Sequence, residues 1–469
     1  MNIVHISAEC YPIAKVGGLA DVVGSLPKYQ NALGVEACVI MPFYDLTFTK
    51  KHKFSKLYSN TVKLGSTSFD FRVLKLESSE LGFTLFLIDV KELLFKDYVY
   101  SFDDTDRFLA FQKAVLDWLL TFKEKPSIIH CHDHHTALIP FMLQECYRYR
   151  PLNNIPTVLT IHNAQYQGWF DYDKLSYIPD FNVDNVGLLD WDGVINPLAT
   201  GIKCAWRVTT VSPTYMEELK QKANGLESLL TAEKKKCLGI LNGIDVEVWN
   251  PEKDAYLVKK YTVRNNISGK KANKKYLCEK FKLHKNKPLF IFIGRLVGEK
   301  GADLLPEVFT KVLADKNCTV LVLGSGNKDI EKELYKLQSG YSGHYNAYTG
   351  YNEKLSHIMY AGADFLLMPS RVEPCGLNQM YSLKYGTIPV VRSIGGLKDT
   401  VIDITKKNGF GICHKEATVA AIIKAVKKAI TLYDDNQQEY RKISKKIMQI
   451  DHSWNTSAEA YITLYKSII

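Results

Sequence analysis

The stretch Pro288–Leu305, PLFIFIGRLVGEKGADLL, sets a pattern that much of the chain repeats. It begins with a run of apolar, β-branched and aromatic residues, Leu289–Ile293, which is typical of a strand buried on both faces of a parallel sheet. Gly294 ends the run, and a helical pattern begins near Gly301. The stretch therefore predicts a strand, a loop and a helix. The loop leaves the carboxyl end of the strand, where α/β proteins bind ligands.

Two basic residues, Arg295 and Lys300, lie in this loop. Arginine offers a planar fork of donors and lysine a compact positive charge, and both suit phosphate oxygens. The amino end of the next helix would add backbone N–H groups and a favourable dipole. These features predict a diphosphate cradle, and the alternative is two surface charges on an ordinary loop.

Composition sets the outer limits on fold and function. At 469 residues the chain is too long for one compact core, so we expect about two domains. The net charge is +10, but there is no arginine-rich arm, so we expect a solvated basic face, chiefly over Lys259–Lys287 and the C-terminal helices, and no nucleic-acid partner. Ten cysteines without a CxxC pair indicate neither a disulfide framework nor a zinc ribbon. Because the sequence shows no signal peptide and no membrane-length apolar run, we expect a cytoplasmic protein without a membrane partner.

A glycine-rich turn follows the first predicted strand, Asn2–Ser7. Gly17 and Gly18 let the backbone approach a ligand closely, because no Cβ is in the way, and Lys15 stands just before them. A helical pattern begins at about Asp21. Strand, glycine-rich loop and helix are the order of a phosphate or sugar-phosphate site. The sequence is neither GxGxxG nor a P-loop, however, and a plain turn with a chance lysine fits it as well.

Further strands are expected in the first half, and polar side chains follow two of them. The expected strands are Val35–Met41, Ser127–His132, Pro156–Ile161 and Arg207–Val211, with a hairpin-like insertion over Val62–Leu64, Ser68–Leu76 and Phe83–Ile88. Asp133 follows one strand and is well placed for a sugar hydroxyl. His162 and Asn163 follow another, at the edge of the sheet where ligands bind.

The run His130–His135, HCHDHH, has the composition of a metal site. Side chains on a strand alternate between its faces, so consecutive histidines cannot all converge on one ion. Zinc is therefore a minor alternative here, and we expect no metal.

The strand–helix alternation restarts in the second half of the chain. The turn Leu241–Asp245, after which the composition becomes polar and basic, marks the expected domain boundary. Later strands are expected at Cys318–Leu323, Tyr345–Thr349, Phe365–Met368 and Ile388–Val391. Two successive arrays imply two Rossmann-like domains facing each other across a cleft.

The stretch MPSRVEPCGL follows one of these strands and carries Glu373, with Gly376 expected to open the next helix. A carboxylate can accept hydrogen bonds from two sugar hydroxyls, and N–H groups at a helix start hold anionic oxygens. Gly395 and Gly396 lie in a further glycine-rich turn between strand and helix. Both turns are therefore candidate ligand loops.

Taken together, these motifs resemble the bacterial glycogen synthases and plant starch synthases. The matching pieces are KVGGL (15–19), IHN (161–163), NGID (242–245), GRL with its following EKG (294–301), SRVEPCGL (370–377) and GGL (395–397), and their order and separation match across essentially the whole chain. Related retaining transferases carry a second glutamate eight residues after the first. Here that position is Tyr381, as in the glycogen and starch synthases.

The resemblance implies an α/β fold of the GT-B type. The implied domains are a Rossmann-like acceptor-side domain over 1–245, a nucleotide-sugar-binding domain over 246–452, and a C-terminal helix over 453–469 that crosses back to the first domain. It also implies transfer of glucose from ADP-glucose to the 4-hydroxyl at the non-reducing end of an α-1,4-glucan, with retention of configuration. Neither a metal nor an organic cofactor is expected.

The resemblance also assigns roles to residues. Arg295, Lys300 and Lys15 would stabilise the departing diphosphate, Glu373 would hold glucose hydroxyls, and His162 would contact the sugar. The implied catalytic set is Lys15, His162, Arg295, Lys300 and Glu373, and the implied substrate-binding set is Gly17, Gly18, Asp21, Asp133, Asn163, Asn242, Cys375, Gly376, Leu377, Tyr381, Gly395 and Gly396.

Three other functions compete with this one. A transferase that uses UDP-glucose on the same fold is the nearest. A glucan phosphorylase would need a pyridoxal phosphate lysine and a much longer chain. A catalytically silent glucan-binding protein is the alternative without enzymatic activity, and the presence of every charged position of the motif set argues against it.

Overall fold

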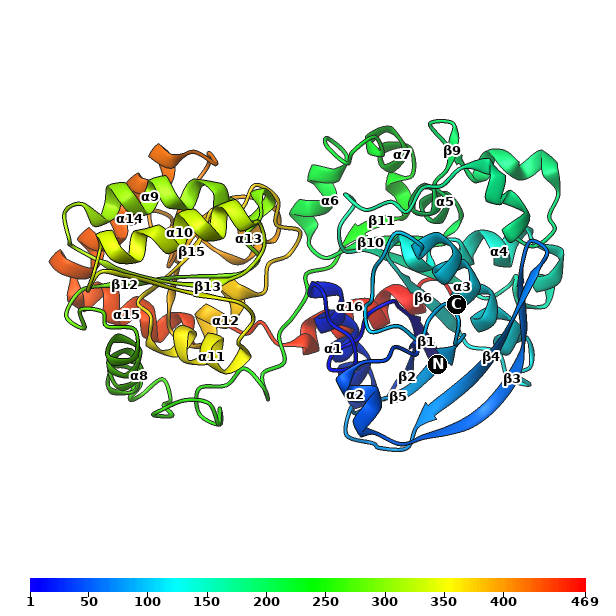
Figure 1. Ribbon diagram of the computed structural model, residues 1–469, viewed down its shortest axis with the longest axis horizontal. Helices are drawn as coiled ribbons and strands as arrows, with labels where there is room; N and C mark the ends of the chain where they lie inside the picture. Colours follow the sequence, from blue (N-terminus) through cyan, green and yellow to red (C-terminus); the bar gives the residue numbers. More distant parts are fainter. The chain divides into compact units, whose positions relative to one another are not determined.

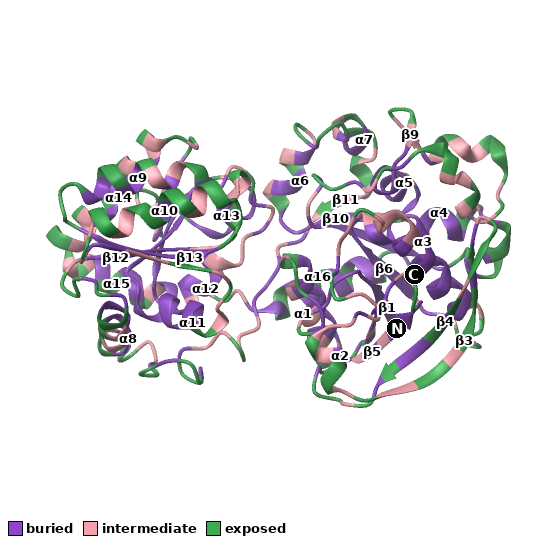
Figure 2. Cartoon of the chain, in the orientation of Figure 1, coloured by how far each residue is buried: buried purple, intermediate pink, exposed green.

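The computed structural model describes residues 1–469, which form two compact units. Unit 1 comprises Met1–Gly243 and Trp454–Ile469, and unit 2 comprises Ile244–Ser453. Each unit contains its own large sheet (Figure 1). In both units the central strands of the sheet are largely buried, whereas the β3–β4 edge and the outer faces of many helices are exposed (Figure 2). None of the helices combines the length and the apolar character that crossing a membrane requires.

The sheet of unit 1 has nine strands in the order β11-β10-β7-β6-β1-β2-β5-β4-β3. Its parallel strands are β1 (Asn2–Ile6), β2 (Glu36–Pro42), β5 (Thr84–Asp89), β6 (Ile128–His132), β7 (Thr157–Ile161), β10 (Arg207–Thr210) and β11 (Cys237–Gly239). The antiparallel pair β3 (Phe54–Leu64) and β4 (Thr67–Leu76) extends one edge. The chain order reverses between β1 and β6, and such switch points are where doubly wound sheets bind ligands.

Helices and short segments complete unit 1. They are α1 (Gly18–Ala32), α2 (Thr47–Lys51), α3 (Asp104–Leu120), α4 (Ile139–Glu145), α5 (Pro197–Cys204), α6 (Pro213–Leu219), α7 (Glu227–Ala232) and α16 (Trp454–Lys466), with the small strands β8 (Asp190–Trp191) and β9 (Val194–Ile195). The last helix, α16, packs beside α1 (Figure 1). Trp454, Tyr461 and Tyr465 of α16 share one buried cluster with Leu26 and Ile128. Burial of these large aromatic rings holds the C-terminal helix to unit 1.

The sheet of unit 2 is wholly parallel, in the order β14-β13-β12-β15-β16-β17. Its strands are β12 (Leu289–Ile293), β13 (Thr319–Gly324), β14 (Tyr345–Thr349), β15 (Phe365–Met368), β16 (Ile388–Arg392) and β17 (Ile412–His414), and its helices are α8 (Asn266–Lys280), α9 (Leu305–Leu313), α10 (Lys328–Gly340), α11 (Glu353–Gly362), α12 (Asn378–Lys384), α13 (Gly395–Thr400), α14 (Val419–Asp435) and α15 (Gln437–Ile447). The helices cover both faces of this sheet (Figure 1). Numbered along the chain, the strands run 3-2-1-4-5-6, the Rossmann order, with the switch point between β12 and β15. The prediction of two Rossmann-like domains is confirmed.

The expectation of solvated lysines over Lys259–Lys287 is wrong for two lysines of one helix, whereas Lys271, Lys275 and Lys280 of that helix are exposed. Lys270 and Lys274 of α8 are buried. Lys270 Nζ donates to Thr387 Oγ1 at 2.7 Å, and Lys274 Nζ lies 2.6 Å from Asp364 Oδ2. Because both ammonium groups find partners inside the unit, the polar sequence of α8 conceals a packed helix.

Candidate active site

Two loops meet at the switch point of unit 2. One follows β12 and the other follows β15, and these strands are neighbours in the sheet. The backbone N–H of Arg371 donates to Glu299 O at 2.7 Å, and its guanidinium forms a two-pronged ion pair with Asp303, with N–O distances of 2.5 and 2.8 Å. These contacts fasten the predicted diphosphate loop to the loop that carries Glu373.

Glu373 is the centre of this arrangement and is only 5% exposed. Its Oε1 lies 2.7 Å from Lys300 Nζ, and its Oε2 accepts a hydrogen bond from Ser370 Oγ at 2.8 Å. Arg295 lies on the same loop as Lys300, but its side chain is half exposed, with one nitrogen 3.2 Å from Glu299 Oε2. The structure thus brings Lys300 and Glu373 into contact and leaves the Arg295 guanidinium accessible to a ligand.

Glycines let the backbone segments around Glu373 approach closely. A Cβ on Gly396 would lie 2.0 Å from Cys375 O, and one on Gly301, which has a φ of +67°, would lie 2.5 Å from Pro369 O. The N–H of Gly396 donates to Glu373 O at 3.1 Å. Gly395, the first residue of α13, is buried beside this contact. Gly395 and Gly396 therefore shape the Glu373 loop by backbone packing.

The helix after this loop begins later than the sequence suggested. Gly376 does not open it: α12 starts at Asn378 with Leu377 as its N-cap, and Gly376 has a left-handed φ of +72°. Tyr381 of α12 is 8% exposed and stacks on Trp249 at a ring-centroid distance of 3.8 Å. We interpret Tyr381 as a packing residue and leave it out of the proposed ligand contacts.

The glycine-rich loop of unit 1 is held by a residue that the sequence did not single out. Glu9 is 3% exposed, and its Oε2 accepts hydrogen bonds from the N–H groups of Val16 and Gly17 at 2.6 and 3.0 Å. Tyr100 OH donates to its other oxygen. The only sequence signal for this role of Glu9 was the position of a carboxylate shortly after the first strand. Its partners are 7, 8 and 91 positions away, and the spacing of residues does not reveal such contacts.

The outer side of the same loop is open. A Cβ placed on Gly17 or Gly18 would meet no atom within 4 Å. Lys15 Nζ lies 2.7 Å from Asp21 Oδ1 and over the ring of Tyr11. The helix begins at Gly18, three residues earlier than predicted, so Asp21 lies in its first turn. Lys15 and Asp21 therefore form one charged pair at the amino end of α1.

Asp133 faces the backbone. It has a φ of +55°, and its Oδ1 accepts the backbone N–H of His162 at 2.7 Å. Burial raises the pKa of its carboxyl to about 7. Its Oδ1 thus fixes the turn that carries His162, and binding of a sugar hydroxyl by this carboxyl stays a prediction.

His162, Asn163 and Asn242 follow β7 and β11, on the carboxyl side of the sheet. His162 Nε2 lies 3.0 Å from His132 Nδ1, and burial lowers the pKa of His162 to about 3, so the ring is neutral. Asn163 Oδ1 accepts the N–H of Gln165 at 3.0 Å. Asn242 is 5% exposed, and its Oδ1 has no hydrogen-bond partner. Such an unpaired buried acceptor is costly unless a ligand completes it.

The histidines of the run His130–His135 fall into two groups, two on a strand and two in the 3-10 helix that follows it. His130 and His132 lie on β6, and their rings approach His5 of β1. His134 and His135 belong to a 3-10 helix after the strand, and His135 stacks on Tyr100 at 4.8 Å. The whole run does not converge, although one nitrogen each from His5, His130 and His132 lie within 4.8 Å of one another.

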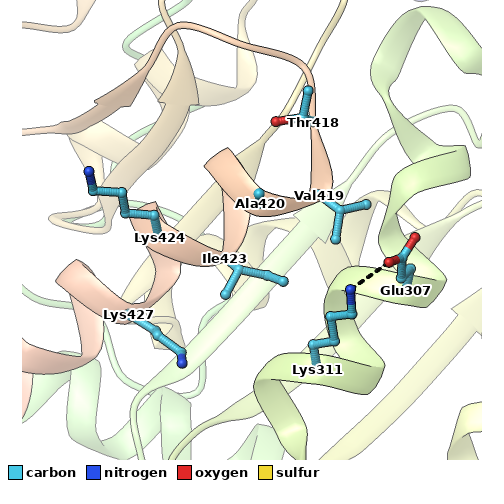
Figure 3. A pocket seen from close by; sticks show the side chains of 8 residues that line it. All are labelled: Glu307, Lys311, Thr418, Val419, Ala420, Ile423, Lys424 and Lys427. Carbon is cyan, nitrogen blue, oxygen red and sulfur yellow. Dashed lines mark hydrogen bonds and ion pairs between the residues drawn. The ribbon is translucent and has the colours of Figure 1, made fainter.

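A surface hollow of about 680 Å³ lies between α9 and α14 (Figure 3). Its lining includes the ion pair of Lys311 and Glu307, at 2.7 Å, and the side chains of Lys424 and Lys427. None of the predicted site residues lines it. We therefore assign the candidate active site to the switch-point loops and not to this hollow.

Comparisons with known proteins agree with the fold. Residues 2–232 match the family model of the starch synthase catalytic domain, and residues 273–447 match that of glycosyl transferases group 1. A solved sucrose-phosphate synthase from Thermosynechococcus elongatus, 17% identical, has a TM-score of 0.63 over 100% of this chain and 98% of its own, and shows the shared fold alone. Fold and site together define a GT-B glycosyltransferase.

Proteins of higher sequence identity show which family of glycosyltransferases the chain belongs to. The chain is 52% identical to a glycogen synthase of Flavobacterium johnsoniae, over 100% of this chain and 99% of the relative, and 38% identical to one of Acholeplasma laidlawii with the same coverage. The solved catalytic domain of starch synthase IV from Arabidopsis thaliana, bound to ADP and acarbose, has a TM-score of 0.92 at 31% identity and covers 100% of this chain and 99% of its own. The chain belongs to the family of glycogen and starch synthases. It is a glucosyltransferase of glycogen synthesis, with a nucleotide-sugar donor and a glucan acceptor.

Proposed function

We propose that the donor is ADP-glucose and that glucose passes to the 4-hydroxyl at the non-reducing end of an α-1,4-glucan with retention of configuration. The observation that carries the proposal is the contact of Lys300 with the buried Glu373 at the switch point of unit 2. A nucleotide-sugar transferase needs a cation for the leaving phosphate and an acceptor for sugar hydroxyls, and these two residues supply both. The relation to starch synthase IV, which binds ADP, favours adenine as the base.

Departure of the nucleotide is the step that the cations assist. When the bond to the anomeric carbon breaks, the distal phosphate of ADP gains negative charge. Lys300 has three N–H donors and gives one to Glu373, so the others are available to phosphate oxygens. The half-exposed Arg295 adds a fork of donors on the same loop. Fixed charges of this kind stabilise developing charge without reorganisation, and we propose that they replace a divalent ion.

Groups of unit 1 act on the sugar and on the phosphate in this proposal. His162 contacts the glucose ring, and its backbone carbonyl faces the cationic anomeric centre. Asn163, Asn242 and Asp21 support the sugar and diphosphate, and Lys15 adds a further cation at the glycine-rich loop. The unpaired Oδ1 of the buried Asn242 supports a role in ligand binding. Glu9 positions the glycine-rich loop without touching the substrate, and Asp133 holds the turn that carries His162.

Attack by the glucan hydroxyl on the face that the nucleotide leaves would retain configuration. In this proposal the transition state is loose and resembles an oxocarbenium ion, and no stable covalent intermediate forms. Water competes with the glucan hydroxyl, so exclusion of water from the bound donor favours transfer over hydrolysis.

The test is to incubate the protein with glycogen and either ADP-glucose or UDP-glucose, and to measure the released nucleotide. We expect rapid release of ADP and slow release of UDP. Preferential UDP release would instead support the UDP-glucose transferase. Glycogen binding without release of either nucleotide would indicate a catalytically silent glucan-binding protein.

We also propose that the protein acts in the cytoplasm. All ten cysteines are free thiols. Thiols of this kind suit a reducing compartment. Fractionation of the source cells with an antibody against the chain would test this placement.

A further inference from the structure

A continuous series of buried hydrogen bonds leads from His162 to the C-terminal helix, entirely within unit 1. His162 Nε2 lies 3.0 Å from His132 Nδ1, and His132 Nε2 lies 3.1 Å from His5 Nδ1. His5 Nε2 lies 2.8 Å from Gln30 Oε1, and Gln30 Nε2 donates to Tyr465 OH at 3.3 Å. Apart from His162, which is 8% exposed, the members of this series are 0% exposed.

The series has a second branch beyond Tyr465. Tyr465 OH lies 2.7 Å from His130 Nδ1, and His130 Nε2 lies 2.6 Å from Thr160 Oγ1. Thr160 in turn lies 2.6 Å from Thr209 Oγ1. Each ring nitrogen of His5, His130 and His132 therefore has a partner already, and the set is complete without a metal ion.

Gln30 gives the series a direction, because its donor and acceptor are different atoms. Its Oε1 can only accept, so His5 must carry its proton on Nε2 and accept at Nδ1. By the same reasoning His132 donates from Nε2 to His5 and accepts at Nδ1. His162 must then donate from Nε2 to His132, which leaves its Nδ1 without a proton.

A neutral state of all three rings is a condition of this reasoning, because an imidazolium donates from both nitrogens. Burial lowers the pKa of His5 to about 4 and that of His162 to about 3, and it holds the pKa of His132 well below its usual value. No acidic side chain takes part in the series, and the hydrogen bond to Gln30, which raises the pKa of His5, is outweighed by burial. At neutral pH each ring therefore carries one proton.

We propose that His5, Gln30, His132 and Tyr465 are positioning residues that fix His162 as its Nε2–H tautomer and so present Nδ1 to the substrate as a hydrogen-bond acceptor. Nδ1 forms no hydrogen bond within the chain, and it is the ring atom left for a ligand. A glucose hydroxyl would donate to it. This inference rests on the sugar-binding role proposed above for His162.

Tyr465 of the C-terminal helix α16 contacts Gln30, the residue that gives the series its direction. The amide of Gln30 could turn over and offer its N–H groups to His5, and the opposite tautomer would then be set along the whole series. In the orientation found, Tyr465 OH accepts from Gln30 Nε2 and so satisfies the amide at the end opposite His5, and its own proton is then available to His130 Nδ1. The docking of α16 thus contributes to the chemistry of the His162 ring as well as to the core.

The direct test is ¹⁵N NMR of the full-length protein with labelled histidine, with His162 assigned by its loss in His162→Ala. We expect a protonated Nε2 and an unprotonated Nδ1. In Gln30→Met and in the milder Tyr465→Phe, the His162 signals should move toward a mixture of tautomers. The kcat should then fall about twofold or more, because a large share of the molecules would hold the unproductive form, while the KM for glycogen changes little.

Gln112→Met is the matched control, since Gln112 is a buried amide of α3 that bonds to Phe108 O and Leu138 N outside the series. It should leave the His162 signals unchanged. A proton on Nδ1 in the wild type, or unchanged signals in both series variants, would overturn the proposal. Stoichiometric binding of added Zn²⁺ to His5, His130 and His132 would also overturn it, because the metal would take their lone pairs.

The same experiments separate this proposal from the function on which it rests. If His162→Ala keeps full kcat although the wild type shows the expected tautomer, the sugar-binding role of His162 is wrong and the series is only structural. If His162→Ala is inactive but the wild type holds the opposite tautomer, the role stands and the series does not set it as proposed.

Discussion

Lys300 Nζ lies 2.7 Å from Glu373 Oε1, although the two residues are 73 positions apart and belong to loops after different strands. The carboxylate is buried and the ammonium is a quarter exposed. The pair therefore joins the group that would hold the sugar to the group that would hold the phosphate. The orientation of the Lys300 side chain therefore depends on that of the Glu373 side chain.

The first prediction is that these two residues are energetically coupled. In a cycle of Lys300→Met, Glu373→Gln and the double variant, we expect the free energies of unfolding to depart from additivity by about 0.5–3 kcal/mol, measured by urea denaturation. The pair Lys311 and Glu307 on α9 has the same 2.7 Å separation but is more than half exposed, and it serves as the control. Its cycle should show coupling below about 1 kcal/mol. Additive effects at Lys300 and Glu373 would contradict the prediction.

The second prediction concerns Glu9. Glu9→Ala removes the charged acceptor of two backbone N–H groups, so we expect a loss of about 2–3 kcal/mol in unfolding free energy and a raised KM for the donor. Glu36→Ala, at an exposed position on β2, should change stability by no more than about 0.5 kcal/mol. Urea denaturation and initial rates measure both effects. Wild-type stability and kinetics in Glu9→Ala would refute the role assigned to this carboxylate.

The third prediction concerns close backbone packing at Gly396. Because a Cβ there would lie 2.0 Å from Cys375 O, Gly396→Ala must displace the Glu373 loop. We expect a loss of about 1–3 kcal/mol in stability and a large fall in kcat. Gly340→Ala, where a Cβ meets no atom within 4 Å at the end of α10, should keep full activity and gain up to about 1 kcal/mol. Equal behaviour of the two variants would argue against the packing account.

The fourth prediction is a pH dependence that originates at Asp133. Its carboxyl has a pKa of about 7 in the folded protein and an ordinary value of 3.8, so between these limits the folded state binds a proton that the unfolded state lacks. Its contribution to stability is therefore full below about pH 4 and is lost as pH rises through 7. Compared with Asp133→Asn, the wild type should lose about 1.4 kcal/mol per pH unit between pH 5 and 7, with little further change above pH 8.

Asparagine suits this comparison because it tolerates the left-handed φ of +55° at position 133. Urea denaturation at several pH values measures the difference between the two proteins, and contributions of the buried histidines largely cancel. A difference that does not vary with pH would show that the carboxyl titrates normally.

Strands buried on both faces could be predicted closely from the sequence. The expected segments Leu289–Ile293 and Phe365–Met368 coincide with the buried strands β12 and β15. Such strands carry apolar side chains on both faces and read as continuous apolar runs. The same patterns therefore predicted the ligand edge of each sheet.

Short or exposed elements were harder to predict. The three-residue strands β11 and β17 give no periodic signal. Strand β3 begins at Phe54, eight residues before the expected Val62, because most of its side chains face solvent and alternate weakly. Helix α8 was hidden because its buried positions include lysines, whose partners come from distant segments.

In the candidate site, the sequence indicated residues that stay predictions, and it did not indicate the partners that the structure gives them. A position at a strand end indicated Lys300, Glu373 and His162. Contacts such as Glu9 with Gly17, or Asp133 with the His162 backbone, depend on side-chain direction and on chain segments far apart in sequence. Local patterns carry no information on such contacts, so the bond from the His162 backbone to Asp133 was not predicted.

The central claim is that a fixed cation on the β12 loop stabilises the departing nucleotide. The most direct measurement is the rate of ADP release from ADP-glucose with glycogen, for the wild type and for Lys300→Ala, with the exposed Lys328→Ala as control. The account predicts about a hundredfold loss of kcat in Lys300→Ala, equivalent to about 3 kcal/mol, and no loss in the control. A folded Lys300→Ala enzyme that releases ADP at the wild-type rate would contradict it.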